Sequence, residues 1–115
     1  MYVFVYGTLK RGYSNHHWMG QAVYTDTAHT ADQYVLYART YPCMMRGPPT
    51  YHVEGEIYVI DDAILANLDI LEGYPSLYTR DVIDVVRSSG ERVKAWAYFC
   101  NEPEGNMLPE GRYLE

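Results

Sequence analysis

Hydrophobic and polar residues repeat along the chain with two different periods, and these periods predict its main elements. Residues 2–6 form a continuous apolar and aromatic run that ends at Gly7, which is typical of a strand buried on both faces. In residues 52–60 the apolar side chains fall on one face of a strand and the polar ones, together with Tyr58, on the other. The apolar set is Val53, Ile57 and Val59. This alternation predicts a half-buried strand.

The period then changes to that of a helix. Residues 61–72 carry an apolar stripe at helical spacing. The stripe consists of Ile64, Leu65, Leu68 and Leu71. Asp61 or Asp62 is suited to cap the first turn. Gly73, followed by Pro75, is suited to end the last turn, so we predict one main helix here.

Weaker patterns predict the remaining elements. A short helix capped by Ser14 or Asn15 is expected to end near Gly20. Residues 41–50 hold three prolines and a glycine, which predicts irregular structure, and the tail after residue 100 is polar. Further strands are expected at residues 22–28, 33–38, 78–87 and 92–100, the last two forming a hairpin.

The spacing of these elements indicates the fold class. It is too short for repeated βαβ crossovers, so the strands should pair mostly antiparallel. We expect an α+β fold, a small and mostly antiparallel β-barrel with one main helix. A single domain over residues 1–115 is expected, because a chain of this length buries one core.

Charge and cysteine content narrow the function classes. The formal net charge of −6 argues against a nucleic-acid partner, and no polybasic segment is present to bind an anionic membrane. No apolar run approaches the roughly 18 residues of a membrane span, and the first residues do not resemble a signal peptide, so we expect a cytoplasmic protein. Cys43 and Cys100 are expected to be reduced structural thiols, because two cysteines are too few for a disulfide scaffold.

Glu72 is the most informative single residue. It lies four residues after Leu68 and therefore extends the buried stripe of the predicted helix. It also lies at the helix C-terminus, where the macrodipole is negative. Burial and the dipole both raise the pKa of a carboxylic acid toward the range useful to a general acid or base. The alternative is a glutamate in a frayed last turn, open to solvent.

The junction after the first predicted strand is a second candidate. A buried strand that ends at Gly7 brings backbone N–H groups to the edge of a sheet, where they suit a carboxylate or a developing oxyanion. The segment matches no phosphate-binding glycine motif. A metal site is not expected, because His16 and His17 are adjacent and His29 and His52 are scattered.

These segments together resemble a known family. Residues 3–12, read Val-Phe-Val-Tyr-Gly-Thr-Leu-Lys-Arg-Gly, are similar to the opening of the γ-glutamyl cyclotransferase-like superfamily, in its γ-glutamylamine cyclotransferase and AIG2-like branch. Residues 53–58 resemble the central strand of that family, and residues 68–74, with Tyr78 and Arg80 after them, resemble its catalytic segment. The resemblance runs from the first strand to the last.

The resemblance implies a fold, a reaction and a set of residues. It implies a small α+β barrel in which the backbone of residues Tyr6, Gly7, Thr8 and Leu9 holds a γ-glutamyl group and Glu72 is the catalytic acid and base. The substrate's own α-amine attacks its side-chain carbonyl and gives 5-oxoproline and a free amine or amino acid. No cofactor and no metal is needed, and the partner is a small γ-glutamyl molecule.

Several alternatives stay open at the level of sequence. We also assign Tyr78, Arg80 and Tyr113 to the rim of the substrate site, although for Tyr78 and Arg80 the alternative of bracing the barrel is favoured. A binding module for a small carboxylate or a peptide terminus is the main alternative to an enzyme. A third interpretation is removal of a γ-glutamyl protecting group in a biosynthetic pathway.

Overall fold

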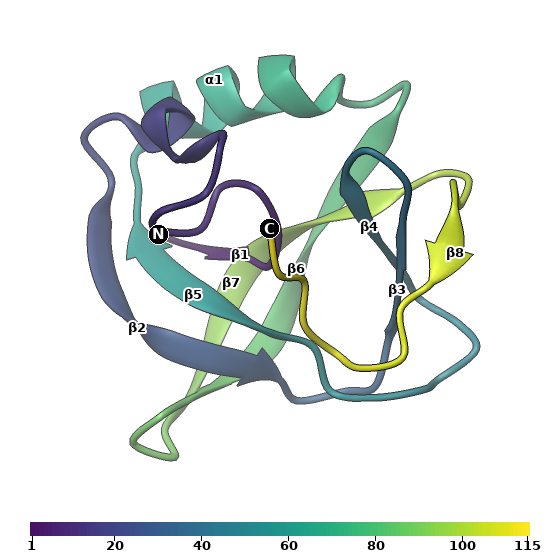
Figure 1. The fold of residues 1–115 in the computed structure, drawn as a ribbon. Helices are drawn as coiled ribbons and strands as arrows, with labels where there is room; N and C mark the ends of the chain where they lie inside the picture. Colours follow the sequence, from purple (N-terminus) through teal and green to yellow (C-terminus); the bar gives the residue numbers. More distant parts are fainter.

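A closed five-stranded barrel forms the body of the protein, in a computed structural model that describes all residues 1–115 (Figure 1). In barrel order the strands are β1 (Tyr2–Val5), β5 (Glu54–Val59), β2 (Val23–Thr30), β6 (Tyr78–Arg87) and β7 (Arg92–Cys100). Neighbouring strands pair antiparallel, and a parallel contact between Val3 and Trp96 closes the barrel. The predicted barrel is confirmed, and so are the hairpin of β6 and β7 and the buried first strand.

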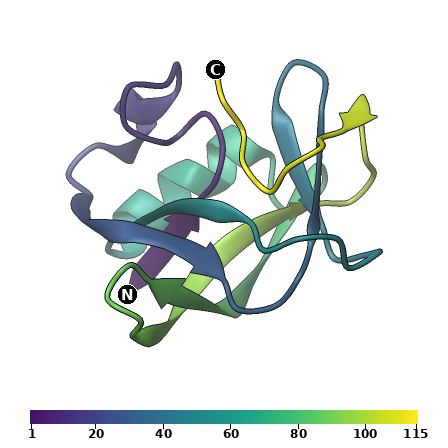
Figure 2. The same ribbon diagram turned by 60° about the horizontal axis from the view of Figure 1, so that its bottom comes forward.

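A small second sheet lies against one end of the barrel (Figures 1 and 2). Its central strand is β3 (Val35–Ala38), flanked by β4 (Pro42–Met45) and β8 (Asn106–Met107). The prediction of irregular structure for residues 41–50 is therefore wrong for β4, and the polar tail contributes β8. Pro42 is compatible with this because it occupies the first position of an edge strand, where a missing N–H is tolerated.

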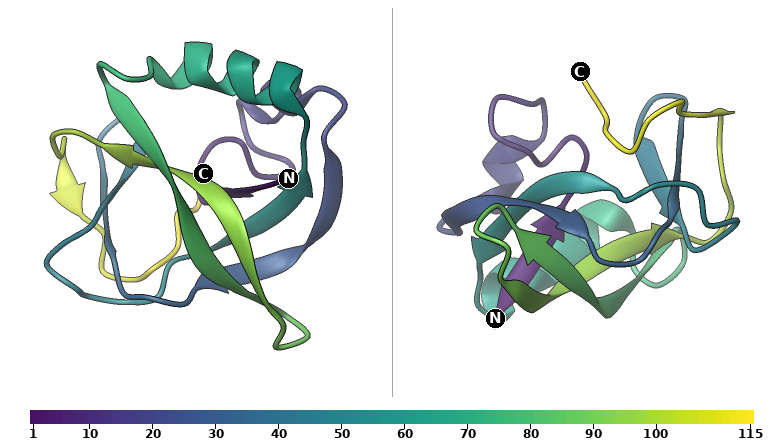
Figure 3. Two further views of the ribbon diagram at one scale, coloured as in Figure 1. Left: turned by 180° about the vertical axis from the view of Figure 1, so that it is seen from behind. Right: turned by 90° about the horizontal axis from the view of Figure 1, so that it is seen from below.

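The main helix, α1 (Asp62–Glu72), lies across the outside of the barrel, as Figure 3 shows from behind. Asp61 caps it, with Oδ1 accepting from the N–H of Ile64 at 2.8 Å. The expected short helix is a single 3₁₀ turn, η1 (His16–Met19), beside α1. No helix of the structure is both long and apolar enough to cross a bilayer.

The hydrophobic core has two parts because both faces of the barrel wall are covered. One cluster of 13 buried residues fills the barrel, and a second, of nine, lies between the barrel wall and α1. The expected half-buried pattern of β5 is therefore wrong at two positions. Tyr58 is 2% exposed because it lies in the second cluster, whereas Val59 at the strand end is 42% exposed.

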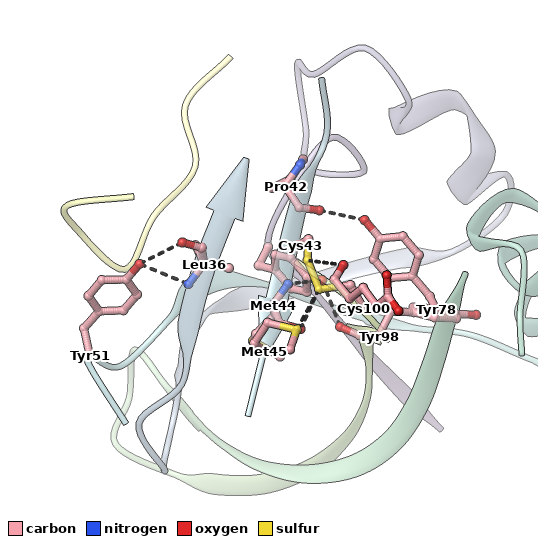
Figure 4. Close-up of a disulfide and its surroundings, with 11 residues drawn as sticks. Leu36, Pro42, Cys43, Met44, Met45, Tyr51, Tyr78, Tyr98 and Cys100 are labelled. Carbon is pink, nitrogen blue, oxygen red and sulfur yellow. Dashed lines mark hydrogen bonds between the residues drawn. A yellow bond between two sulfur atoms is a disulfide. The ribbon is translucent and has the colours of Figure 1, made fainter. Parts of the chain in front are cut away.

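The two cysteines are paired, which corrects the expectation of two reduced thiols. A disulfide joins Cys43 in β4 to Cys100 at the end of β7, with their Cα atoms 5.5 Å apart (Figure 4). The two residues are 57 positions apart in sequence, so the spacing of the cysteines along the chain carries no sign of the pairing. The bond ties the small sheet to the barrel beside Pro42.

The close approach of β1 and β5 allows only glycine at position 55. A Cβ there would overlap the carbonyl oxygen of Val5 and come within 2.8 Å of the Phe4 ring. We predict that Gly55→Ala lowers the free energy of unfolding by about 1–3 kcal/mol, the usual cost of overpacking a core. Urea unfolding followed by circular dichroism measures the change. Val82→Ala, at a strand position that is 43% exposed, serves as the control; an equal effect of both substitutions would contradict the prediction.

Candidate active site

A cavity of about 260 Å³ lies where the end of β1, the end of α1 and the start of β6 meet. Nine of its 14 lining residues are hydrophobic, and Glu72 is the one carboxylate or other charged side chain among them. The lining consists of Phe4, Val5, Tyr6, Gly7, Thr8, Leu9, Asn15, Tyr41, Pro42, Leu71, Glu72, Leu77, Tyr78 and Tyr98. The size suits a small metabolite, because drug-sized ligands occupy sites of roughly 300–1,000 Å³.

Glu72 is the last residue of α1, and the way that the helix ends determines where its side chain lies. Gly73 adopts the left-handed conformation, with φ 64° and ψ 38°. The N–H of Gly73 donates to the carbonyl of Ile70 at 3.2 Å, and that of Tyr74 to the carbonyl of Asp69 at 2.9 Å. This pattern is a Schellman motif. It stops the helix directly after Glu72 and leaves the carboxyl on the face that meets the cavity.

The Glu72 carboxyl has no partner inside the protein. No hydrogen bond or ion pair to its oxygens is formed, although the residue is largely withdrawn from solvent. Burial raises the pKa of Glu72 to about 7, because the apolar surroundings disfavour the charged form. A carboxyl with this pKa exchanges its proton readily near neutral pH.

The loop after β1 supplies amide groups to the same cavity. The N–H groups of Gly7, Thr8 and Leu9 meet no backbone or side-chain acceptor of the protein. Their conformation is held by other atoms of the loop, since the carbonyl of Gly7 accepts from Lys10 N at 3.1 Å and that of Thr8 from Asn15 N at 3.0 Å. Consecutive free amides of this kind suit a carboxylate or an oxyanion.

Two side chains brace this loop from its C-terminal end. Asn15 Nδ2 donates to Thr8 Oγ1 at 3.0 Å, and His16 Nδ1 lies 2.9 Å from the carbonyl oxygen of Leu9. A Cβ at Gly7 would overlap the ring of Pro42, so glycine lets the loop pack directly against β4. Asn15 is expected from the sequence only as a candidate cap of the short helix, but its side chain makes no capping bond and holds this loop instead, as His16 does.

Four tyrosines form much of the remaining wall, and the hydroxyls of three of them are already bonded. The hydroxyl of Tyr6 donates to the carbonyl of Tyr98 at 2.8 Å and accepts from Met44 N at 3.2 Å. Those of Tyr78 and Tyr98 donate to the Pro42 carbonyl at 3.0 Å and to Asp69 Oδ1 at 2.7 Å (Figure 4 shows the Tyr78 bond).

The charge states of these tyrosines follow from the same contacts. Burial raises the pKa of Tyr6, Tyr78 and Tyr98, and the nearby charge of Glu72 adds to the effect. All three phenols therefore stay neutral at physiological pH, and Glu72 is the group of the cavity poised to exchange a proton.

The structure brings together most of the residues singled out from the sequence. The cavity is lined by Tyr6, Gly7, Thr8, Leu9, Glu72 and Tyr78. Sequence reasoning missed Tyr98 and Tyr41, which belong to a chain with 13 tyrosines and carry no local signal that separates them from the others.

Arg80 and Tyr113 do not line the cavity, so their assignment to its rim is corrected. Arg80 donates to Asp69 of α1 through Nε and Nη2, at 2.8 and 3.1 Å. It therefore braces the barrel, as the alternative interpretation of the sequence expected. Tyr113 lies in the tail. Its carbonyl accepts from Lys10 Nζ at 2.7 Å, and its ring packs edge-on against Tyr13. The tail therefore secures the loop after β1 from outside.

Comparison with known proteins finds similar chains over nearly the whole length of this one. The family model described as γ-glutamyl cyclotransferase, AIG2-like, matches residues 3–115. The γ-glutamylcyclotransferase family protein YtfP of Escherichia coli strain K12 is 38% identical over 118 residues, covering 100% of this chain and 97% of that one. The γ-glutamylaminecyclotransferase A of Danio rerio is 37% identical over 117 residues, covering 92% and 73%.

A solved structure extends the similarity to three dimensions. The crystal structure of an AIG2-like protein from mouse superposes with a TM-score of 0.80 at 33% identity, covering 87% of this chain and 76% of that one. The match of the family model over nearly the whole chain and the likeness in fold lead to one assignment. The chain belongs to the γ-glutamyl cyclotransferase, AIG2-like family.

Proposed function

We propose that this protein is a γ-glutamyl cyclotransferase that converts γ-glutamyl amines or γ-glutamyl amino acids to 5-oxoproline and a free amine or amino acid. The observation that carries the proposal is the pairing, in one small cavity, of the unpartnered Glu72 carboxyl with the free amides of Gly7, Thr8 and Leu9. The names of its relatives support the same class of reaction.

The nucleophile in this reaction belongs to the substrate. Its α-amine nitrogen attacks the side-chain amide carbon and closes a five-membered ring, and the bond from that carbon to the leaving nitrogen breaks. The attacking nitrogen loses a proton and the leaving nitrogen gains one. Glu72 takes the first proton as a carboxylate and returns it as a carboxylic acid, so the enzyme ends in its starting state. The chemistry needs no serine or cysteine nucleophile and no cofactor.

The loop amides supply binding and electrostatic stabilisation. N–H groups without a protein partner bind the substrate carboxylate or the oxygen on which negative charge develops during ring closure. They lie on a loop that is held by its own hydrogen bonds, so they need little rearrangement when the substrate enters. The narrow cavity favours the folded conformation of the glutamyl chain, and this positioning lowers the barrier to intramolecular attack.

The proposal includes the cytoplasm as the compartment, where disulfides are rare because thiol reductants keep cysteines reduced. The wall formed by β4 does not depend on the disulfide alone. The Tyr78 hydroxyl bonds to the Pro42 carbonyl and the Met44 N–H bonds to the Tyr6 hydroxyl, so these two contacts hold β4 in the reduced protein as well.

Substitution of Glu72 tests the proposal directly. We predict that Glu72→Gln keeps the fold and lowers 5-oxoproline release by about 10²–10⁴-fold, the usual contribution of a general acid or base. Chromatographic detection of 5-oxoproline measures it across γ-glutamyl-ε-lysine, other γ-glutamyl amines and γ-glutamyl amino acids. The control is Glu54→Gln, at an exposed glutamate of β5 outside the cavity.

Two results would count against the proposed reaction. If the Glu72→Gln variant is as active as the wild type, Glu72 is not the acid and base. If calorimetry detects binding of 5-oxoproline by the wild type and no γ-glutamyl compound is turned over, the protein is a binding module for small carboxylates.

The raised pKa of Glu72 also makes a prediction for stability. The pKa is about 7 in the folded state against 4.5 as the ordinary value, so the folded state binds the extra proton between these pH values. Stability is therefore lost as the pH rises from about 4.5 to 7. We predict that Glu72→Gln, which resembles the protonated acid, equals the wild type near pH 4.5 and exceeds it by up to roughly 3 kcal/mol above pH 7. Urea unfolding at pH 4.5, 6 and 8 measures the difference; a pH-independent difference would contradict the desolvated acid.

A further inference from the structure

Asp69 forms a network of hydrogen bonds that lies just outside the cavity. Its Oδ1 accepts from Arg80 Nε at 2.8 Å and from the Tyr98 hydroxyl at 2.7 Å, and its Oδ2 accepts from Arg80 Nη2 at 3.1 Å. Arg80 belongs to β6 and Tyr98 to β7. Asp69 is the one side chain of α1 that is hydrogen-bonded to the barrel, so it fixes the helix to these two strands.

The network is well placed to be strong. The side chains of Asp69 and Arg80 are 20% and 18% exposed, so solvent screens the pair less than it screens a surface ion pair. The Arg80 guanidinium lies 4.7 Å from the centre of the Tyr74 ring and 4.5 Å from that of Trp96. Two-point binding to a carboxylate and contact with two aromatic rings leave the guanidinium a single orientation.

The backbone of Asp69 fixes the same helix end a second time. Its carbonyl accepts from the N–H of Tyr74 at 2.9 Å, and of the two bonds of the Schellman motif this one spans more residues. Glu72 lies within this closed turn, three residues after Asp69 and one before Gly73. A change in the attachment of Asp69 therefore moves the turn that carries the Glu72 carboxyl.

Asp69 also holds part of the wall that faces Glu72. The Tyr98 ring lines the cavity, and its hydroxyl is held by Asp69. The carbonyl of Tyr98 in turn accepts from the hydroxyl of Tyr6, which is also in the cavity wall. One carboxylate outside the cavity thus connects the helix end to the wall opposite it.

We propose that Asp69, with Arg80 as its partner, is the positioning residue that holds the Glu72 carboxyl in its desolvated place in the cavity. The inference rests on the proposed function and adds to it a residue that touches neither the substrate nor the cavity. Asp69 acts through Glu72 and Tyr98, because it anchors the turn that carries one and the ring of the other.

A direct effect of charge has to be separated from this effect of position. The other ionisable groups that line the cavity with Glu72 are Tyr6 of the segment after β1, Tyr41 just before β4, Tyr78 of β6 and Tyr98 of β7, and no cationic side chain lines it. Removal of the Asp69 charge lowers the pKa of Glu72 by electrostatics alone, whereas removal of the Arg80 charge raises it. If the end of α1 moves, the pKa of Glu72 falls whichever of the two side chains is removed, because water then reaches the carboxyl.

The experiment therefore uses Asp69→Asn and Arg80→Met, which break the same pair with opposite changes of charge. Asp84→Asn is the matched control, since Asp84 also pairs with basic side chains of β7, Lys94 at 2.9 Å and Arg92 at 3.6 Å, on the part of the hairpin away from α1. Carbon-13 NMR of the Glu72 carboxyl gives its pKa without any substrate. Steady-state kinetics give kcat and KM for the best γ-glutamyl substrate.

We expect the pKa of Glu72 to fall by about one pH unit in both variants and kcat to fall roughly tenfold or more, with KM changed less than about threefold. Asp84→Asn should leave all three quantities as in the wild type. Arg80→Lys, which keeps the charge and one hydrogen bond, should lie between Arg80→Met and the wild type.

Opposite pKa changes in Asp69→Asn and Arg80→Met would overturn the proposal in favour of a direct charge effect. Unchanged pKa and kcat with only a lower melting temperature would overturn it in favour of a bracing role. Because the NMR titration needs no turnover, a protein without cyclotransferase activity would refute the proposed function and still leave the positioning of Glu72 open to this test.

Discussion

A carboxyl group without a partner in a mostly apolar cavity is the constraint on which the structure depends. Water would solvate Glu72 if the end of the helix were free to move, and its pKa would then return to the ordinary range. The fold prevents this with backbone geometry. The left-handed Gly73 closes the Schellman motif, and the buried stripe that contains Leu68 presses the last turn against the barrel. Burial of the acid is thus a consequence of where the helix stops.

The hydrogen bonds of the other polar groups around the cavity explain why the Glu72 carboxyl has no partner. The hydroxyls of Tyr6, Tyr78 and Tyr98 are each bonded to a carbonyl or to Asp69, so none of these three is free to donate to Glu72 and stabilise its charged form. The loop after β1 is the opposite case, because the carbonyls of Gly7, Thr8 and Leu9 are bonded and their N–H groups are not. The cavity therefore keeps one unpartnered carboxyl and one set of free N–H donors.

Distant parts of the chain support these two features. The small sheet and the residue before it supply Pro42 and Tyr41 to the wall. The sheet is tied to the barrel by the disulfide (Figure 4) and by the bond from Met44 N to the Tyr6 hydroxyl. The tail supports the loop after β1 from outside, through Lys10 and through Ser14, whose N–H donates to the Glu115 carboxylate at 2.7 Å. A small site thus draws on segments that run from the first strand to the C-terminal tail of a chain of 115 residues.

Local patterns in the sequence alone determined the barrel strands, the extent of α1 and the loop at Gly7, and they placed Glu72 on the buried stripe while leaving a frayed last turn as the alternative. Periodicity and end signals are properties of neighbouring residues, so they can be read without coordinates. Only the tertiary structure decided that Cys43 meets Cys100, that Tyr98 reaches the cavity and that Arg80 turns to Asp69. These outcomes depend on how strands pair and how the helix crosses them. Contacts between segments 11 to 57 residues apart leave no periodic signal in one sequence.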